Sequence, residues 1–320
     1  MKKIGVVTAG GDAPGMNAAL RSVVRSAIHN HFEVIGFERG YEGIIEGQAR
    51  SMGPRSVSGI VNLGGTILKT SRSEEIRTPE GLEKAAESLK NWGIEGLVTI
   101  GGDGTFRGAN ELYKVSGISM IGIPATIDND VAGTETTVGF DTAVNTALSA
   151  IDKIRDTSMS HERIFVVEVM GRTRGFLALE VGIAGGAEIV LVPEIKTNLD
   201  DICERLQSDR REGKRSEIIV MAEGAGNSNA MVNYIIQQTE YVVRLTTLGY
   251  IQRGGSPTAQ SRILASEFGC QAVDLLLEGE SKRMVAVQKG RITSVDLDNA
   301  SRKTKRLDLK RLKLAEIISH

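Results

Sequence analysis

The chain has 320 residues, a hydrophobic share of 41% and a net charge of −1, which describe a globular protein long enough for two domains. The near balance of 39 basic and 40 acidic residues argues against a general nucleic-acid binder, and an aromatic share of 4% argues against a base-stacking surface. We expect no signal peptide and no membrane span, because no segment has the apolar length for either. The two cysteines, Cys203 and Cys270, form no CxxC motif and favour reduced thiols in a cytoplasmic protein.

Short apolar runs alternate with segments of helical periodicity along the chain. The predicted strands are 4–8, 34–37, 97–100, 120–123, 164–169, 189–192 and 218–221, and the predicted helices are 16–28, 80–92 and 142–155. We expect Gly93 to end the helix 80–92, and Thr105 to cap a helix that follows the strand 97–100. The basic segment 301–320 is expected to dock as a terminal helix with a solvated charged face. The alternation predicts an α/β protein with mostly parallel sheets and with ligands beyond the carboxyl ends of the strands.

Two glycine-rich turns, Gly10-Gly11-Asp12 and Gly101-Gly102-Asp103-Gly104, each follow a predicted strand. Glycine lets the main chain approach a phosphate closely, and a helix N-terminus attracts its charge. A carboxylate in such a turn repels phosphate unless a cation lies between them, so Asp103 is a candidate Mg²⁺ ligand. The alternative interpretation is a pair of tight turns that hold no ligand. Neither GxxxxGK[ST] nor GxGxxG occurs, which argues against a common P-loop and against a nicotinamide dehydrogenase.

The segment 121–130 combines an apolar run with a cluster of polar residues. We expect Pro124 to prevent the strand from continuing. Asp128 is a candidate general base toward an alcohol, and Asp130 is a candidate to help hold a hard cation. An Asx-rich turn without chemistry remains the alternative. Dispersed arginines are candidate phosphate ligands, with Arg172 and Arg253 singled out because each lies in a glycine-rich turn; the set is Arg72, Arg77, Arg163, Arg172, Arg244 and Arg253.

The ordered motifs of the chain carry a resemblance to a known family. They are Gly10 to Asn17, Gly101 to Gly104, Pro124 with Thr126 to Asp130, Met170 to Arg172, and Gln252 to Pro257. Over nearly its whole length the chain resembles the bacterial ATP-dependent 6-phosphofructokinases (the phosphofructokinase A family). The resemblance implies the phosphofructokinase fold, with two three-layer αβα domains. A larger nucleotide-binding domain is expected at 1–139 plus 252–302, and a smaller sugar-phosphate domain at 140–251 plus 303–320.

The same resemblance implies a cytoplasmic glycolytic kinase, a transferase that moves the γ-phosphoryl of ATP to the 1-hydroxyl of fructose 6-phosphate with Mg²⁺. It implies a homotetramer, a dimer of dimers whose active site is shared between subunits, with no nucleic-acid or membrane partner. The implied catalytic residues are Asp128 as general base with Thr126, Arg172 and Gly11. The implied metal ligands are Asp103 and, through water, Asp130.

The implied binding residues fall into three sets. The ATP set is Gly11, Tyr41, Arg72, Ser73, Arg77, Gly102, Asp103, Gly104, Thr105 and Gly108. The sugar-phosphate set is Thr126, Ile127, Asp128, Arg163, Met170, Gly171, Arg172, Glu223, Arg244, Tyr250 and Arg253, with Arg163 and Arg244 supplied by a neighbouring subunit. The effector set, for ADP and phosphoenolpyruvate, is Arg21, Arg25, Arg55, Arg155, Gly186, Glu188, Arg211 and Lys214.

Some positions separate this chain from the family pattern or from rival functions. Gly104 and Ala125 favour ATP over pyrophosphate as donor, whereas Tyr250, Lys69 and Ser73 depart from the usual residues. Departures at Arg55, Gly59 and Glu212 predict a weakened or altered effector response.

Three alternatives remain: a pyrophosphate-dependent phosphofructokinase, an NAD or lipid kinase with the same glycine turn, and a catalytically silent sugar-phosphate sensor. Met170 to Arg172 and Arg253 disfavour the second, and intact Asp103, Asp128 and Arg172 disfavour the third.

Overall fold

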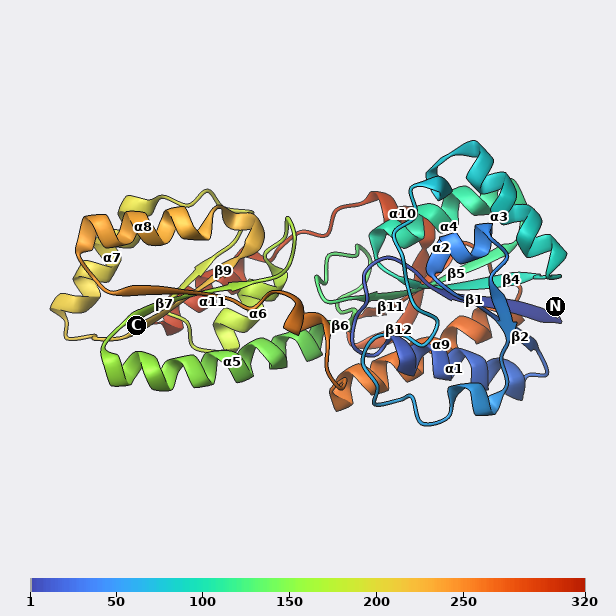
Figure 1. Cartoon of the computed structure of the whole chain (residues 1–320), viewed down its shortest axis with the longest axis horizontal. Helices are drawn as coiled ribbons and strands as arrows, with labels where there is room; N and C mark the ends of the chain where they lie inside the picture. The colour runs from blue at the N-terminus through green and yellow to red at the C-terminus, as the bar shows by residue number, and fades with distance from the viewer. Residues whose placement is uncertain (1, 320) are drawn as a thin grey trace. The chain divides into compact units, whose positions relative to one another are not determined.

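A computed structural model describes residues 2–319, and Met1 and His320 lie outside the described part. The chain forms two compact units (Figure 1). The first unit comprises Met1–Thr142 and Arg253–Lys305, and the second comprises Ala143–Gln252 and Arg306–His320. The chain therefore changes unit after Thr142, Gln252 and Lys305. The sequence analysis expected these changes after 139, 251 and 302.

The first unit is built on an eight-stranded sheet with the strand order β12-β11-β5-β4-β1-β2-β3, and β6 pairs with β5 beyond this path. All pairs are parallel except β2–β3 and β11–β12, which are antiparallel at the two edges. The mostly parallel sheet was predicted and is confirmed. The strands are β1 (Lys3–Thr8), β2 (Glu33–Phe37), β3 (Ala49–Ser51), β4 (Gly96–Gly101), β5 (Ser119–Thr126), β6 (Val138–Gly139), β11 (Arg283–Gln288) and β12 (Arg291–Asp296).

Helices cover both faces of this sheet. Figure 1 shows α1 and α9 on one face and α2, α3, α4 and α10 on the other, so the unit has three layers. Glycines in the strands make room for large core side chains: a Cβ on Gly122 would lie 2.7 Å from the Phe106 ring, which is fully buried. The helices are α1 (Met16–His29), α2 (Gly40–Ile45), α3 (Pro79–Asn91), α4 (Asp103–Ser116), α9 (Ala259–Leu277) and α10 (Leu297–Arg302), with short 3₁₀ turns η1 (Pro54–Val57) and η2 (Glu75–Arg77).

The second unit contains a four-stranded parallel sheet with the order β10-β7-β9-β8. Figure 1 shows α7 and α8 on one face of this sheet and α5 and α6 on the other. Leu206 from α7 and Ile235 from α8 are fully buried against Val166 and Ile219 of the central strands. The elements are α5 (Phe140–His161), β7 (Ile164–Val169), α6 (Phe176–Ala184), β8 (Ile189–Leu191), α7 (Leu199–Arg211), β9 (Glu217–Ala222), η3 (Glu223–Ala225), α8 (Ser228–Thr239), β10 (Val243–Thr247), η4 (Gly249–Arg253) and α11 (Leu309–Ile318).

Two local expectations are wrong. Strand β5 continues through Pro124 to Thr126. Pro124 is opposite Gly101, the last residue of β4, and pairing with β6 begins only at Ala125, so the missing N–H falls where one ladder ends and the next begins. Thr105 does not cap α4, because the helix already begins at Asp103 after Gly102. The predicted stop at Gly93 is confirmed by its φ of +69°, directly after α3 and its cap Trp92.

The basic segment expected to form a terminal helix contains the end of α10, at Arg302, and then one helix, α11, while residues 303–305 are grouped in the first unit. No helix within residues 2–319 is both long enough and apolar enough to cross a membrane.

Candidate active site

Three turns meet at the carboxyl edge of the first unit's sheet, because β5, β4 and β1 are adjacent and parallel. Thr8 is opposite Ile100, and Gly101 is opposite Pro124, so all three strands end at nearly the same level. The chain then enters the turn at Gly10, the turn at Gly102 and the loop that carries Asp128. The register thus brings together the two glycine turns and the polar cluster that the sequence analysis singled out separately.

The first turn, between β1 and α1, uses glycine for conformation and for close approach. Gly10 has a φ of +88° and Gly15 a φ of +102°, which L side chains rarely adopt. A Cβ on Gly11 would lie 2.3 Å from Nη1 of Arg253. That guanidinium is held beside the turn, 3.8 Å from the Asp12 carboxylate and 3.4 Å from the Asp12 carbonyl oxygen, to which it donates. Glycine at position 11 therefore lets a largely buried cation lie directly against the backbone of this turn.

The second turn leads into α4, and its residues differ in how much room they have. Within residues 2–319 no side chain caps the start of α4, which begins at Asp103. A Cβ on Gly104 would meet no atom within 4 Å, whereas a Cβ on Gly101 would lie 2.4 Å from the Ala9 carbonyl oxygen. The Thr105 hydroxyl donates to that same carbonyl oxygen at 2.9 Å. This hydrogen bond joins the two glycine turns and leaves an uncapped, open helix N-terminus suited to an anion.

Tyr41 and Gly108 contact each other beside the first turns of α4 and lie within the protein interior. The Tyr41 hydroxyl donates to the carbonyl oxygen of Thr105, and its ring packs against Gly108, where a Cβ would approach it to 2.9 Å. The side chain is buried, and that burial raises the pKa of Tyr41 well above its ordinary value. In this structure Tyr41 supports the first turn of α4.

The loop after β5 carries the candidate base. Asp128 is 2% exposed, and its backbone N–H donates to the Thr126 hydroxyl at 3.2 Å. A Cβ on Gly102 would lie 3.6 Å from the Cβ of Thr126, so the second glycine turn and the start of this loop are neighbours. Asn129 adopts a φ of +50°, which turns the chain between Asp128 and Asp130. Asp103 and Asp128 therefore follow adjacent strands at one edge of one unit.

The residues present fit a magnesium ion that arrives with a nucleotide. Among residues 2–319 no group of three or more His, Cys, Asp or Glu side chains could hold a metal. Mg²⁺ at nucleotide sites needs less, since one or two carboxylates, waters and phosphate oxygens complete its octahedron. The Asp103 carboxylate is 28% exposed and forms an ion pair of 3.0 Å with the exposed side chain of Arg107, and such solvent-exposed pairs are weak. Asp103 and Asp130 are carboxylates of the kind that such a site needs, and each follows one of two adjacent strands.

The second unit assembles its own turn at the carboxyl edge of its sheet. Val169 is opposite Ala222, so Met170 to Arg172 and Glu223 follow neighbouring strand ends. One Glu223 carboxylate oxygen accepts hydrogen bonds from the backbone N–H groups of Gly171 (3.1 Å) and Arg172 (2.6 Å). Gly171 and Arg172 have φ values of +137° and +53°, and this double anchor holds the unusual turn.

Gln252 completes this turn and was not assigned a role from sequence. Its side chain is fully buried, and its Oε1 accepts a hydrogen bond from the Met170 backbone N–H at 3.0 Å. The available signal in the sequence was its place at the start of the motif Gln252 to Pro257. Tyr250, two residues earlier, is 82% exposed.

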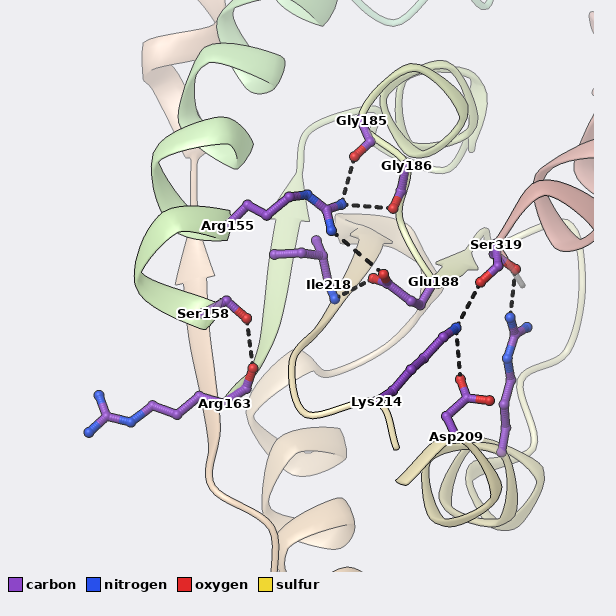
Figure 2. Close-up of polar contacts among 11 residues, drawn as sticks. Arg155, Ser158, Arg163, Gly185, Gly186, Glu188, Asp209, Lys214, Ile218 and Ser319 are labelled. Atoms are coloured by element: carbon purple, nitrogen blue, oxygen red, sulfur yellow. Dashed lines mark hydrogen bonds and ion pairs between the residues drawn. The ribbon is translucent and has the colours of Figure 1, made fainter. Parts of the chain in front are cut away.

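Arg163 and Arg244 lie at the opposite edge of the second unit's sheet. Arg163 directly precedes β7, and Arg244, near the start of β10, is opposite Phe165. Figure 2 shows the Arg163 guanidinium pointing away from the neighbouring polar residues. The structure therefore does not bring these two arginines together with Met170 to Arg172, which lie at the carboxyl edge.

The expected effector residues of the second unit form a polar cluster (Figure 2). Arg155 donates to the carbonyl oxygens of Gly185 and Gly186, both at 2.7 Å, and lies 3.6 Å from the Glu188 carboxylate. Lys214 donates to the Ser319 carbonyl oxygen at 2.9 Å and lies 3.5 Å from the Asp209 carboxylate. Arg211 is exposed at the end of α7.

Glu217 is a buried acid beside this cluster, 3% exposed. Burial, reinforced by Asp209 and Glu188, raises the pKa of Glu217 to about 7, against the opposing effect of Lys214 and Arg205. No pattern in the sequence distinguished Glu217 from other residues of a strand.

Several other expected site residues of the first unit lie at or near the surface, whereas Ile127 is 1% exposed. Arg72 and Arg77 are exposed, and Arg77 forms a 2.9 Å ion pair with Glu74. The Ser73 hydroxyl accepts a hydrogen bond from the Ile76 backbone N–H. Arg21 and Arg25 lie on α1, and Arg55 is exposed in η1.

Comparison with known proteins places this geometry in a family. The sequence model described as "Phosphofructokinase" matches residues 3–276. The chain is 50% identical over 319 residues to an ATP-dependent 6-phosphofructokinase of Clostridium botulinum and 51% identical over 331 residues to one of Halothermothrix orenii, with both chains covered completely in each case.

Solved structures show the same likeness. Phosphofructokinase from Saccharomyces cerevisiae matches with a TM-score of 0.88 and 34% identity, over 100% of this chain and 47% of the yeast chain. A pyrophosphate-dependent phosphofructokinase from Marinobacter aquaeolei matches with a TM-score of 0.86 at 22% identity, over 97% of this chain and 86% of that chain, which shows the shared fold.

Proposed function

Because this chain belongs to the phosphofructokinase family, we propose that it is an ATP-dependent 6-phosphofructokinase that converts fructose 6-phosphate and ATP to fructose 1,6-bisphosphate and ADP. The observation that carries this proposal is the placement of Asp103 and Asp128 after adjacent strands, beside two open glycine turns. Phosphoryl transfer depends mainly on positioning and on neutralised charge, and this edge of the sheet supplies groups for both.

In the proposed reaction Asp128 acts as the general base. It accepts the proton of the sugar 1-hydroxyl while that oxygen forms a bond to the γ-phosphorus, and the bond from the γ-phosphorus to the bridging oxygen breaks to release ADP. The Thr126 hydroxyl, which accepts a hydrogen bond from the Asp128 N–H, is proposed to orient the sugar. A base at this position contributes about 10²–10⁴-fold to the rate. Gly11 and Arg172 are proposed to stabilise the transferred group.

The first unit is proposed to bind ATP. The open α4 N-terminus at Gly102 to Thr105 faces no capping side chain within the described residues and suits the phosphate chain. Asp103, with Asp130 through water, would hold Mg²⁺, which neutralises phosphate charge when bound. Arg72, Ser73 and Arg77 are proposed to line the nucleoside, with Tyr41 and Gly108 behind the helix start.

The donor is proposed to be ATP rather than pyrophosphate. A Cβ at Gly104 would point into open space, so the position has room for the α-phosphate of a nucleotide. The relatives at 50% and 51% identity carry the name ATP-dependent 6-phosphofructokinase, whereas the pyrophosphate-dependent neighbour is only 22% identical.

The second unit is proposed to bind fructose 6-phosphate through Met170, Gly171, Arg172 and Glu223, together with Tyr250. In the first unit, Ile127 and Arg253 are proposed as sugar-phosphate ligands. Arg163 and Arg244 are proposed to serve a neighbouring subunit of a homotetramer, a dimer of dimers. Their place at the amino edge, opposite the sugar-binding turn, supports a role outside their own chain's site. Sedimentation analysis of the purified protein tests the tetramer, and a monomeric active enzyme would contradict it.

An effector site for ADP and phosphoenolpyruvate is proposed at Arg21, Arg25, Arg55, Arg155, Gly186, Glu188, Arg211 and Lys214. Arg155 and Lys214 are already paired with Glu188 and Asp209, so an anion must compete with carboxylates for them. We therefore propose a weakened response. Titrating each effector against the initial rate at low fructose 6-phosphate tests this, and a strong sigmoidal shift would contradict it.

A coupled assay with fructose 6-phosphate, comparing ATP, GTP and pyrophosphate as donors, tests the proposed function. We expect turnover with ATP and little with pyrophosphate. Turnover with pyrophosphate alone would establish the rival enzyme. Fructose 6-phosphate binding without turnover with any donor would establish a silent sensor. We propose a cytoplasmic location, which the free cysteines Cys203 and Cys270 fit.

A further inference from the structure

The loop that carries the candidate base, residues 127–137, is closed at its root by the first unit's sheet. Thr126 at the end of β5 is opposite Gly139 of β6. The Thr137 hydroxyl donates to the Thr126 carbonyl oxygen at 2.6 Å. The loop therefore leaves and re-enters the sheet at one place. Its outer part needs separate contacts to hold a fixed conformation.

Asn129 determines how the chain turns between the two carboxylates of the loop. It has a φ of +50° and is 6% exposed, and it separates Asp128 from Asp130. Asparagine tolerates this left-handed conformation better than most residues, but the conformation is still less favourable than an extended one. Its side-chain amide donates to the Glu135 carbonyl oxygen at 3.2 Å, across the loop. A change at Asn129 would redirect the side chains on both sides of it.

Lys305 closes the loop from a distant part of the sequence. Its ammonium lies 2.9 Å from Oδ1 of Asn129 and 3.0 Å from the Glu135 carbonyl oxygen, and it donates to both. The preceding residue, Thr304, forms an antiparallel bridge with Val131. Burial lowers the pKa of Lys305 to about 8, although Asp130 and Glu135 partly oppose this shift. The Lys305 ammonium thus loses part of its hydration and is instead hydrogen-bonded to the loop.

The other side of the contact is also fixed. The Glu135 carboxylate accepts hydrogen bonds from the backbone N–H groups of Lys289 (2.6 Å) and Gly290 (3.2 Å), in the turn between β11 and β12. The Glu135 backbone N–H donates to the Val287 carbonyl oxygen at 2.9 Å. The Glu135 carbonyl oxygen is therefore a fixed point, and Lys305 ties Asn129 to it.

We propose that Lys305 is a positioning residue for phosphoryl transfer, because its ammonium holds Asn129 in the conformation that directs Asp128 and Asp130. This inference rests on the proposed function for the roles of the two carboxylates. It assigns no contact between Lys305 and a substrate. Lys305 is the last residue of the first unit before the chain passes into the second unit. Its hydrogen bonds therefore also fix this part of the chain to the loop that carries Asp128.

The kinetic test compares Lys305→Met, Lys305→Arg and Lys303→Met. Lys303 is exposed and only two residues away, which makes it a matched control. We expect Lys305→Met to lower kcat by about 10- to 100-fold, as a small displacement of a catalytic group does, with each KM changed by less than about threefold. Lys305→Arg, which keeps the charge and the donors, should recover most of kcat, and Lys303→Met should match the parent. A Lys305→Met enzyme with parental kcat would overturn the inference.

A second measurement does not depend on activity. Amide hydrogen exchange of the ligand-free protein should show faster exchange in peptides covering 127–136 in Lys305→Met, while peptides from α1 and β4 keep the parental rate. Parental exchange in 127–136 would overturn the inference even if kcat fell. If the parent chain does not phosphorylate fructose 6-phosphate, the proposed function fails, and exchange alone decides whether Lys305 holds the loop.

Discussion

The Thr105 hydroxyl donates a hydrogen bond to the carbonyl oxygen of Ala9, 2.9 Å away, and so joins two turns that are nearly a hundred positions apart in the sequence. Thr105 is 3% exposed and belongs to the first turn of α4, whereas Ala9 directly follows β1. The hydrogen bond fixes the spacing of the two glycine turns proposed to hold the phosphate chain.

Thr105→Val should test this connection, because valine keeps the shape and removes the donor. We expect a loss of about 1–3 kcal/mol in the free energy of unfolding and a raised KM for ATP. Thr105→Ser, which keeps the hydroxyl, is the control. Urea unfolding and initial-rate kinetics measure the two effects. Equal behaviour of the Val and Ser variants would show that the hydrogen bond contributes nothing.

Asp128→Ser should remove the proposed general base. We expect kcat to fall by about 10³-fold or more with an unchanged far-ultraviolet circular dichroism spectrum, since the side chain accepts the proton in the transition state. Asp152→Ser, an exposed aspartate of α5, serves as the matched control and should leave kcat unchanged. A rate within a few-fold of the parent would take the role away from Asp128.

Gly104→Asp should weaken ATP use without affecting the fold. The added side chain enters open space, so the thermal midpoint should stay within about 2 °C of the parent, but a second carboxylate beside Asp103 repels the triphosphate. We expect kcat/KM for ATP to fall by about 100-fold, a transition-state loss of about 2.7 kcal/mol. Gly104→Ala fills the same space without charge and should lose much less. If the Ala and Asp variants lose the same activity, volume rather than charge is responsible.

Gln252→Leu should loosen the turn at Met170 in the second unit. Leucine cannot accept the Met170 N–H that Gln252 now binds at 3.0 Å. The lost acceptor costs about 1–2 kcal/mol, so we expect KM for fructose 6-phosphate to rise by about 10-fold while KM for ATP stays unchanged. Gln237→Leu, on the exposed side of α8, is the control. Equal increases in both KM values would indicate a general structural effect instead.

Glu217→Gln should change how stability depends on pH. The folded-state pKa of about 7 lies above the ordinary value of 4.5, so the folded state keeps the Glu217 proton that the unfolded state releases. This contribution is fully present below pH 4.5 and is lost as pH rises through about 7. The amide variant has no such proton and should be more stable than the parent at pH 8.

Thermal midpoints at pH 5 and pH 8 measure this change. We expect the variant to gain about 3 °C or more over the parent at pH 8 and little at pH 5. The same difference at both values would show that Glu217 does not titrate in this range.

The sequence identified most of the elements and the residues of the candidate site. Apolar runs next to glycine turns located β1, β4 and β7 to within a residue or so, because buried parallel strands and the turns that follow them have a strong local signature. Asp103 and Asp128 stood out for the same reason: carboxylates directly after buried strands are costly unless they bind or react. Local rules also misled: strand pairing carries β5 through Pro124, and α4 begins at Asp103, before Thr105.

The tertiary structure alone decided which residues hold the site in place. Gln252 opens a motif, but its role as an acceptor comes from Met170, 82 positions away. Glu217 and Lys305 carry no local pattern. The pKa of Glu217 is raised by burial and by Asp209 and Glu188, and Lys305 binds groups 170 and 176 positions away. A hydrogen bond or a desolvated charge depends on which distant groups the order of the strands brings near it. The periodicity of a sequence reflects only residues that are close along the chain, so it does not predict such partners. The sequence therefore determined the chemistry available to this protein, and the packing of its strands and helices determined how that chemistry is held.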